Sequence, residues 1–139
     1  MNKPRTLVLR GILTDRESRV LLLQRSSQSK GWPGYWEFPG GKVDCSEGLV
    51  QALQREFVEE TGLQVDVGKL CAAFEWERED DFLMYLIYQV RVTASREVAI
   101  SPEHDAFGWY TAADLLSVKV SPPLKDLVQK LGLKEQRCV

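Results

Sequence analysis

Residues 41–63 read GKVDCSEGLVQALQREFVEETGL. Within this stretch, apolar residues recur every three or four positions from Leu49 to Phe57, which is the spacing of one face of an α-helix. Gly62 stands where a helix commonly ends on a left-handed residue, a conformation that glycine adopts without steric cost. The pattern therefore predicts a helix over residues 48–61.

Three glutamates, Glu56, Glu59 and Glu60, gather in the second half of this helix. Spacings of three and four residues place their side chains on one side of the helix, where like charges repel by a few tenths of a kcal/mol per pair. A divalent cation would offset that repulsion, and Mg2+ prefers carboxylate oxygens. The alternative is a solvated acidic face with Arg55 as its salt-bridge partner. The flanking glycines, and a fourth glutamate, Glu47, at the helix entrance, favour the cation.

Strand patterns occupy much of the remaining sequence. The expected strands are Leu7–Leu13, Val20–Leu23, Trp36–Phe38, Leu70–Trp76, Phe82–Val92 and Phe107–Tyr110. Polar turns predict that the first two strands form one hairpin and that the fourth and fifth form another. A last helix is expected from Ser121 to about Leu131, because proline suits the first helical position. These elements predict an α/β sandwich, folded as one domain over residues 1–139.

The stretch 41–63 resembles the Nudix box, and every signature residue is present. The polar and glycine signature positions hold Gly41, Glu47, Arg55, Glu56, Glu59, Glu60 and Gly62. The lead-in 36–42 and the chain length are most similar to the mutator-type branch, the 8-oxo-dGTP pyrophosphohydrolases. Gly48 departs mildly from the family pattern, which often has Ser, Thr or Asp as the helix cap, although glycine is an acceptable cap. The resemblance implies a Nudix-type α/β/α sandwich with a mixed β-sheet.

The resemblance also implies an activity, the hydrolysis of a nucleoside diphosphate linked to another group. The favoured substrate is a (d)NTP or a modified nucleotide, cleaved to a nucleoside monophosphate and pyrophosphate. Two alternatives stay open: a coenzyme A or nucleotide-sugar pyrophosphohydrolase, and a non-catalytic nucleotide-binding sensor. The segment Ser121–Leu124 lacks the asparagine with which the mutator type often reads oxidised guanine. A preference for 8-oxo-dGTP is therefore not expected.

By the same resemblance, Glu56, Glu59 and Glu60 hold one or more Mg2+ ions, which Mn2+ can replace. Gly41 adds its backbone carbonyl to this metal site. Glu47 either orients the cluster or joins the metal ligands.

The catalytic set implied by the resemblance is Arg55, Glu56, Glu59 and Glu103. Arg55 braces the glutamates through charge-assisted hydrogen bonds. One carboxylate must accept the proton of the attacking water. Glu56 on the helix and Glu103 in a later loop are both candidates, and Glu103 could equally be a metal ligand or an ordinary surface residue. His104 is interpreted as a loop residue.

Four residues outside the helix are predicted to contact substrate, namely Arg25, Lys42, Trp32 and Tyr35. Arg25 ends a strand that should point at the cleft, so Arg25 and Lys42 are expected at phosphate groups. Trp32 and Tyr35 lie in a polar loop, where large aromatic residues are less expected. They could stack on a base or cover the edge of the core.

The composition limits the kinds of partner that we expect the chain to bind. Eighteen basic and 20 acidic residues give a net charge of −2, which argues against binding long nucleic acid. The sequence contains no apolar run of the roughly 18 residues that a membrane span needs. The three cysteines lack metal-ligand spacing, so reduced thiols and a cytoplasmic location are expected. The expected partner is a small nucleotide, bound by a monomer or a homodimer.

Overall fold

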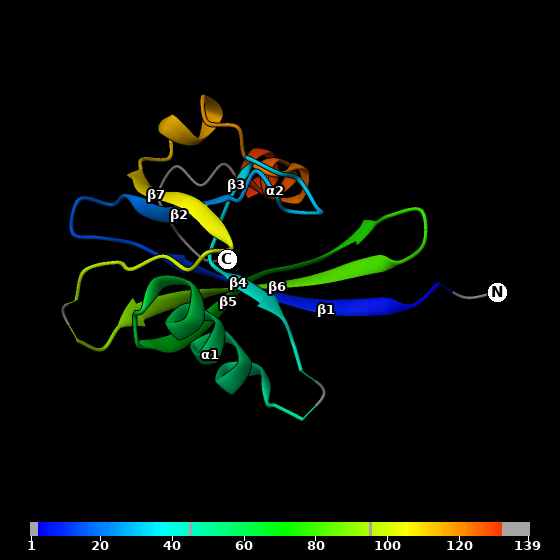
Figure 1. Cartoon of the computed structure of the whole chain (residues 1–139), viewed down its shortest axis with the longest axis horizontal. Coiled ribbons are helices and arrows are strands. Elements are labelled where there is room, and N and C mark those ends of the chain that lie inside the picture. The colour runs from blue at the N-terminus through cyan, green and yellow to red at the C-terminus, as the bar shows by residue number, and fades with distance from the viewer. Residues whose placement is uncertain (1–2, 45, 95, 132–139) are drawn as a thin grey trace.

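The computed structural model describes residues 3–44, 46–94 and 96–131, and its strands form two sheets (Figure 1). The first sheet contains, in spatial order, β4 (Gly40–Lys42), β1 (Arg5–Leu13), β6 (Phe82–Val92) and β5 (Val65–Glu77). The second contains β3 (Trp36–Glu37), β2 (Val20–Arg25) and β7 (His104–Tyr110). The described helices are α1 (Leu49–Thr61), the short 3-10 helix η1 (Asp114–Leu116) and α2 (Pro122–Leu131).

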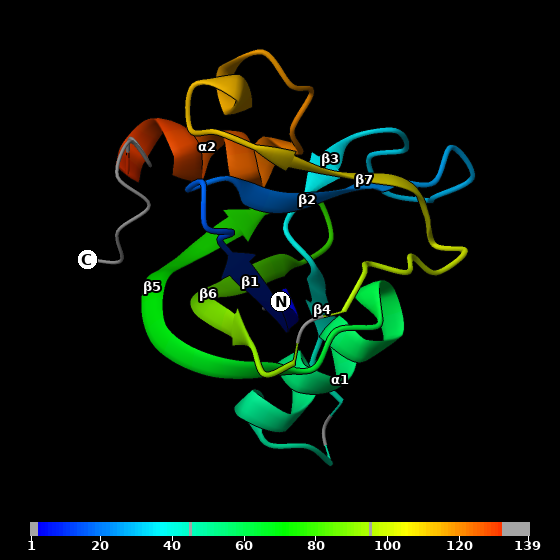
Figure 2. The ribbon, with the colours of Figure 1, turned by 90° about the vertical axis from the view of Figure 1, so that its left-hand side faces the viewer.

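The two long helices lie on opposite sides of the strands (Figure 2). Alternation along β1 explains this, because Leu9 and Leu13 join the apolar cluster of α1 whereas Val8 and Ile12 join that of α2. The strands β1 and β6 pair in parallel and the other strand pairs are antiparallel, so the larger sheet is mixed. The predicted α/β/α sandwich with a mixed β-sheet is confirmed.

Helix α1 begins one residue later than predicted and ends at the predicted residue. Gly48 is its N-cap, and Gly62 ends it in the left-handed conformation with φ 74°, donating its N–H to the Val58 carbonyl at 3.0 Å. On the buried face, Phe57 is fully enclosed and packs against Gly11 of β1. A Cβ at Gly11 would lie 2.5 Å from the Phe57 ring, so the helix approaches β1 closely.

The predicted hairpin of β1 and β2 is wrong. The two strands belong to different sheets and share only an isolated bridge between Thr14 and Val20. The reason is that both edges of β1 are already paired, one with β4 and one with β6. The predicted hairpin of β5 and β6 is confirmed, although β5 begins at Val65 rather than Leu70. Residues Gly40–Lys42 form strand β4, which is not among the strands expected from the sequence.

The cysteines and the helices bear on what the composition led us to expect. Cys71 on β5 is disulfide-bonded, which corrects the expectation of reduced thiols for this residue. Cys45 and Cys138 lie outside the described residues. Within the part of the chain that the structure describes, each helix is too short or too polar to cross a membrane.

Candidate active site

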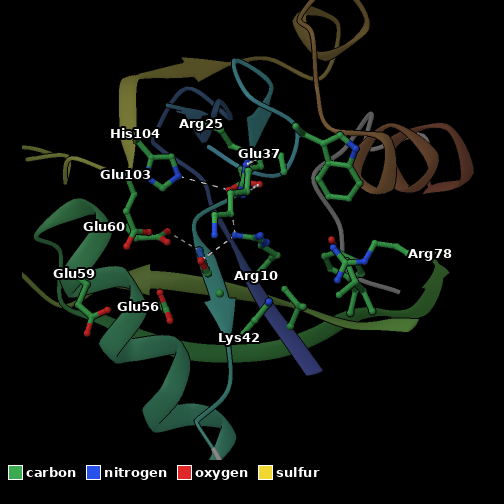
Figure 3. Close-up of a pocket in the computed structure, with 18 residues that line it drawn as sticks. Arg10, Arg25, Glu37, Lys42, Glu56, Glu59, Glu60, Arg78, Glu103 and His104 are labelled. Carbon is green, nitrogen blue, oxygen red and sulfur yellow. Dashed lines mark hydrogen bonds and ion pairs between the residues drawn. The ribbon is translucent and has the colours of Figure 1, made fainter. Parts of the chain in front are cut away.

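A cavity of about 500 Å³ opens beside the second half of α1 (Figure 3). The acidic side chains Glu56, Glu59 and Glu60 lie on one side of it, and Arg78 lies on the other. Strands β1, β3 and β4, together with the loop after β2, contribute most of the remaining lining. The helix predicted from residues 41–63 therefore presents its acidic side to a cavity, not to open solvent alone.

The three glutamates of this acidic wall differ in their surroundings. Glu60 is buried and accepts the backbone N–H of Gly40 on Oε1 at 3.0 Å. Burial raises the pKa of Glu60 to about 8, although Arg10 acts in the opposite direction. Burial also raises the pKa of Glu56, against the effect of Arg55. Glu59 is the most exposed of the three, at 56% of its side chain.

Arg55 holds the acidic wall from its outer side. It donates to Glu47 from Nε at 2.6 Å and from Nη2 at 2.7 Å. Its Nη1 donates to Glu56 at 3.1 Å and to Glu59 at 3.1 Å. The hydrogen bonds to Glu47 and the neighbouring carboxylates hold the pKa of Arg55 above its ordinary value. This arrangement favours a bracing role for Arg55 and an orienting role for Glu47, which is not part of the cavity lining.

The donor set of the acidic wall fits a hard divalent cation. A Cβ at Gly41 would lie 2.7 Å from the carboxyl carbon of Glu56, so the backbone of Gly41 closely approaches that carboxylate. Burial is the main cause of the raised pKa values of Glu56 and Glu60, and the neighbouring carboxylates act in the same direction. Among the described residues, no three acidic, histidine or cysteine side chains converge on one point. Cation binding would therefore require the carboxylates to reorient.

A buried ionic cluster forms part of the cavity lining, and the sequence did not reveal it. Its centre is Glu37 on β3, with only 5% of its side chain exposed. Arg25 donates to both carboxylate oxygens of Glu37 at 3.1 and 3.0 Å, Arg10 lies 3.4 Å away, and Nε2 of His104 lies 3.6 Å away. Burial raises the pKa of Glu37, but Arg10, His104 and Arg25 outweigh it and lower the pKa to about 2.

The low pKa of Glu37 leads to a pH-dependent stability. The depressed pKa means that the stabilisation is complete above the ordinary value of 4.5 and is lost as the pH falls towards 2. At 1.36 kcal/mol per pH unit, this fall in pKa corresponds to roughly 3 kcal/mol. Urea unfolding of the wild type and Glu37→Gln should differ by about this amount at pH 7. The difference should shrink between pH 4.5 and 3, and parallel profiles would contradict the assignment.

The cluster has a signal that could have been read from the sequence. Arg10 is a lone charge in the apolar strand 7–13, on the face that carries Val8 and Ile12. Glu37 is likewise a lone charge between Trp36 and Phe38. Isolated charges at core-facing positions indicate buried partners, because an unpaired buried charge is strongly unfavourable.

The four residues predicted to contact substrate do not all line the cavity. Lys42 and Trp32 line the cavity, and so does Glu103. The guanidinium of Arg25 also reaches the cavity, but it is bound to Glu37, to Ser29 Oγ and to the Gly31 carbonyl. These bonds favour a structural role for Arg25.

Tyr35 lies in a separate surface groove, where the Lys119 ammonium is 4.2 Å from the ring centroid. Two basic residues that were not among the four, Lys30 and Arg78, also line the cavity. The cation of Arg78 is paired with Asp81. The lysines are therefore the better candidates for phosphate contacts.

Comparisons with known proteins agree with this geometry. Residues 4–131 match the family described as the NUDIX domain. The chain is 33% identical over 110 residues to the CTP pyrophosphohydrolase of Escherichia coli (strain K12), covering 79% of each protein. It is 28% identical over 135 residues to the nucleoside triphosphatase NudI of Klebsiella pneumoniae (strain 342), covering 87% of this chain and 93% of that one. The MutT protein from Methanosarcina mazei Go1 shares the fold, with a TM-score of 0.85, 24% identity and 99% of both chains covered.

The α/β/α sandwich presents an acidic helix to a cavity, an arrangement that suits a divalent cation. The match over residues 4–131 then identifies the family: the chain belongs to the Nudix hydrolases. It is accordingly a hydrolase that acts on phosphorus-containing acid anhydrides. The resemblance read from residues 41–63 is confirmed.

Proposed function

We propose that this chain hydrolyses nucleoside triphosphates, with Mg2+ or Mn2+, to a nucleoside monophosphate and pyrophosphate. The observation that carries the proposal is the cavity itself, in which the acidic wall of α1 shares one space with Lys30, Lys42 and Trp32. Carboxylates suit the cation, lysines suit phosphate oxygens, and an aromatic ring suits a base. The names of the two relatives, a CTP pyrophosphohydrolase and a nucleoside triphosphatase, support the same substrate class.

The roles of the residues follow from their places in the cavity. Glu56, Glu59 and Glu60, with the Gly41 carbonyl, would hold Mg2+, which supplies the positive charge that neutralises the phosphates and acidifies water. Lys42 and Lys30 bind phosphate oxygens and hold the chain of phosphates against the acidic wall. The water oxygen attacks a phosphorus atom of the anhydride, the bond to the bridging oxygen breaks, and pyrophosphate leaves.

The water proton passes to a carboxylate, and two candidates line the cavity. Glu56 lies on the acidic wall, with its carboxyl group against the backbone of Gly41. Glu103 precedes β7 and lies near the acidic wall in Figure 3. Comparison of Glu103→Gln with the wild type over a range of pH separates them, because only the loss of the base removes the acidic limb of the kcat profile.

A substrate panel with Mg2+ tests the function. It contains the four NTPs, dNTPs, an oxidised dGTP, ADP-ribose, a nucleotide sugar and coenzyme A. Turnover of the triphosphates is scored by phosphate released after added pyrophosphatase, and turnover of the other compounds by chromatographic separation of their two products. We expect turnover of nucleoside triphosphates, with CTP tested first because of the CTP pyrophosphohydrolase relative. The phosphate signal should require pyrophosphatase, and formation of the nucleoside monophosphate, followed directly by chromatography, should stop with excess EDTA.

The other outcomes distinguish the alternatives. Preferred turnover of coenzyme A or a nucleotide sugar would replace the triphosphate assignment. Nucleotide binding without turnover of any compound would indicate a sensor. Undiminished turnover in EDTA would contradict the cation site.

A further inference from the structure

Arg10 on β1 lies outside the stretch 41–63, yet it joins that stretch to the buried cluster. Its side chain is 12% exposed and lines the cavity between the acidic wall and Arg78 (Figure 3). Nη1 donates to the Gly40 carbonyl at 2.9 Å and to the Phe38 carbonyl at 3.3 Å, and it lies 3.4 Å from Glu37. One guanidinium thus contacts a buried carboxylate and the backbone of the loop between β3 and β4.

Both backbone groups of Gly40, its carbonyl and its N–H, are hydrogen-bonded to side chains. Its carbonyl accepts from Arg10, and its N–H donates to Oε1 of Glu60. Its φ of 148° lies in a region that favours glycine, and a Cβ there would overlap the Leu9 carbonyl oxygen. Side chains from β1 and α1 therefore fix this residue in a conformation that most residues do not adopt.

Gly41, the next residue, connects the Gly40 peptide to the acidic wall. Gly41 lies against the carboxyl group of Glu56, since a Cβ at Gly41 would lie 2.7 Å from the carboxyl carbon. The bond from Gly40 to Glu60 uses Oε1, so Oε2 of Glu60 remains for a cation. The positions of Glu56, Glu60 and the Gly41 backbone thus all depend on how the Gly40 peptide is held.

The stability gained from the Arg10–Glu37 ion pair alone does not explain why an arginine is buried at this position. Taking two charges out of water costs about as much as their attraction returns, so a buried ion pair contributes little net stability. Here a single guanidinium nitrogen, Nη1, contacts the Glu37 carboxylate and also donates to two backbone carbonyls, so the same charge holds the backbone at Phe38 and Gly40.

We propose that Arg10 is a positioning residue, which holds the Gly40 peptide so that Glu56, Glu60 and the Gly41 backbone stay adjacent and can turn their oxygens towards the divalent cation. The proposal rests on the metal-dependent activity proposed above. It assigns to Arg10 no contact with the nucleotide. Its effect should therefore appear in cation binding and in kcat rather than in the KM for nucleotide.

The test compares Arg10→Lys and Arg10→Met with the wild type. Arg5→Met is the matched control, because Arg5 lies on the same strand, is 51% exposed and pairs with Glu75 on the surface. Mn2+ binding to the nucleotide-free protein is followed by electron paramagnetic resonance of the free ion. The kcat and KM with Mg2+ and the thermal unfolding temperature are measured on the same samples.

Both Arg10 variants should bind Mn2+ about 10-fold more weakly and lose about 10- to 100-fold in kcat, the range found when residues behind metal ligands are replaced. The KM for nucleotide should stay within about threefold, and Arg5→Met should match the wild type. If Arg10→Met does not fold, Arg10→Lys still carries the test, since it keeps a buried charge beside Glu37. In that variant the amide of Gly40 should exchange its hydrogen at least about 10-fold faster.

Three results would overturn the proposal. The first is a lowered unfolding temperature with unchanged Mn2+ affinity and kcat, which would make Arg10 structural only. The second is a rise in KM alone, which would place Arg10 at the nucleotide. The third is full recovery in Arg10→Lys, which would show that a buried positive charge suffices without the guanidinium. A wild type without Mg2+-dependent turnover would instead refute the proposed function, and the Mn2+ comparison would still test the positioning.

Discussion

Replacing Glu59 with glutamine is expected to lower kcat with Mg2+ by about three orders of magnitude while the protein stays folded. Glutamine keeps the shape of the side chain and removes one negative charge from the acidic wall. A divalent cation shared by three carboxylates depends on that charge, and so does the positive field that it supplies to the phosphates. The measurement is kcat at saturating Mg2+ with the best nucleotide of the panel.

The fold should tolerate this change because Glu59 is half exposed. It has 56% of its side chain in solvent and contacts Arg55 at 3.1 Å. The substitution removes that exposed ion pair but also relieves repulsion by Glu56, so we expect a change in stability within about 0.5 kcal/mol.

Glu77→Gln is the matched control, since Glu77 is an exposed glutamate at the end of β5 that pairs with Lys3 and does not line the cavity. The control should keep the wild-type kcat. Unchanged, Mg2+-dependent turnover in Glu59→Gln would remove Glu59 from the cation site.

The part of the site that the sequence predicted is the part encoded locally. The helical spacing, both helix ends and the order of the glutamates are contained in residues 41–63, and α1 occupies Leu49–Thr61 as a result. The hairpin of β5 and β6 is local in the same sense, because its two strands are joined by the short charged turn 78–81. Short-range patterns of this kind specify structure without knowledge of the rest of the chain.

The rest of the site depends on contacts between distant segments. Strand β1 pairs in parallel with β6, and Arg5 faces Phe82, so the sheet order could not be read from neighbouring turns. Arg10 and Glu37 meet across two different sheets, which is why each looked like an isolated charge. The loop after β2 gives a third example: Trp32 adopts a φ of 45° and reaches the cavity, whereas Tyr35 lies in the groove beside Lys119. Sequence alone could not separate these two aromatic residues.

Gly40→Ala is expected to destabilise the protein by more than about 4 kcal/mol, and so to prevent stable folding. The new Cβ would overlap the carbonyl oxygen of Leu9 and lie 2.8 Å from Cα of Arg10. Both atoms are backbone of the central strand β1, which cannot move aside without breaking its pairing with β4 and β6. The φ of 148° adds a further penalty of roughly 1–3 kcal/mol for any residue with a side chain. Expression, circular dichroism and urea unfolding measure the effect.

Gly41→Ala is the matched comparison, and it should separate activity from folding. Its Cβ would meet the carboxyl group of Glu56 at 2.7 to 2.8 Å, which is the end of a flexible side chain rather than backbone. The carboxylate can rotate away, so we expect a loss of about 1 kcal/mol or less in stability. A displaced Glu56 no longer faces the Gly41 backbone, and kcat should fall by at least about 10-fold. If Gly41→Ala kept the wild-type kcat, the close approach of Gly41 and Glu56 would have no part in the reaction. If Gly40→Ala unfolded at the same urea concentration as the wild type, the close contact of Gly40 with the backbone of β1 would not restrict the residue at this position.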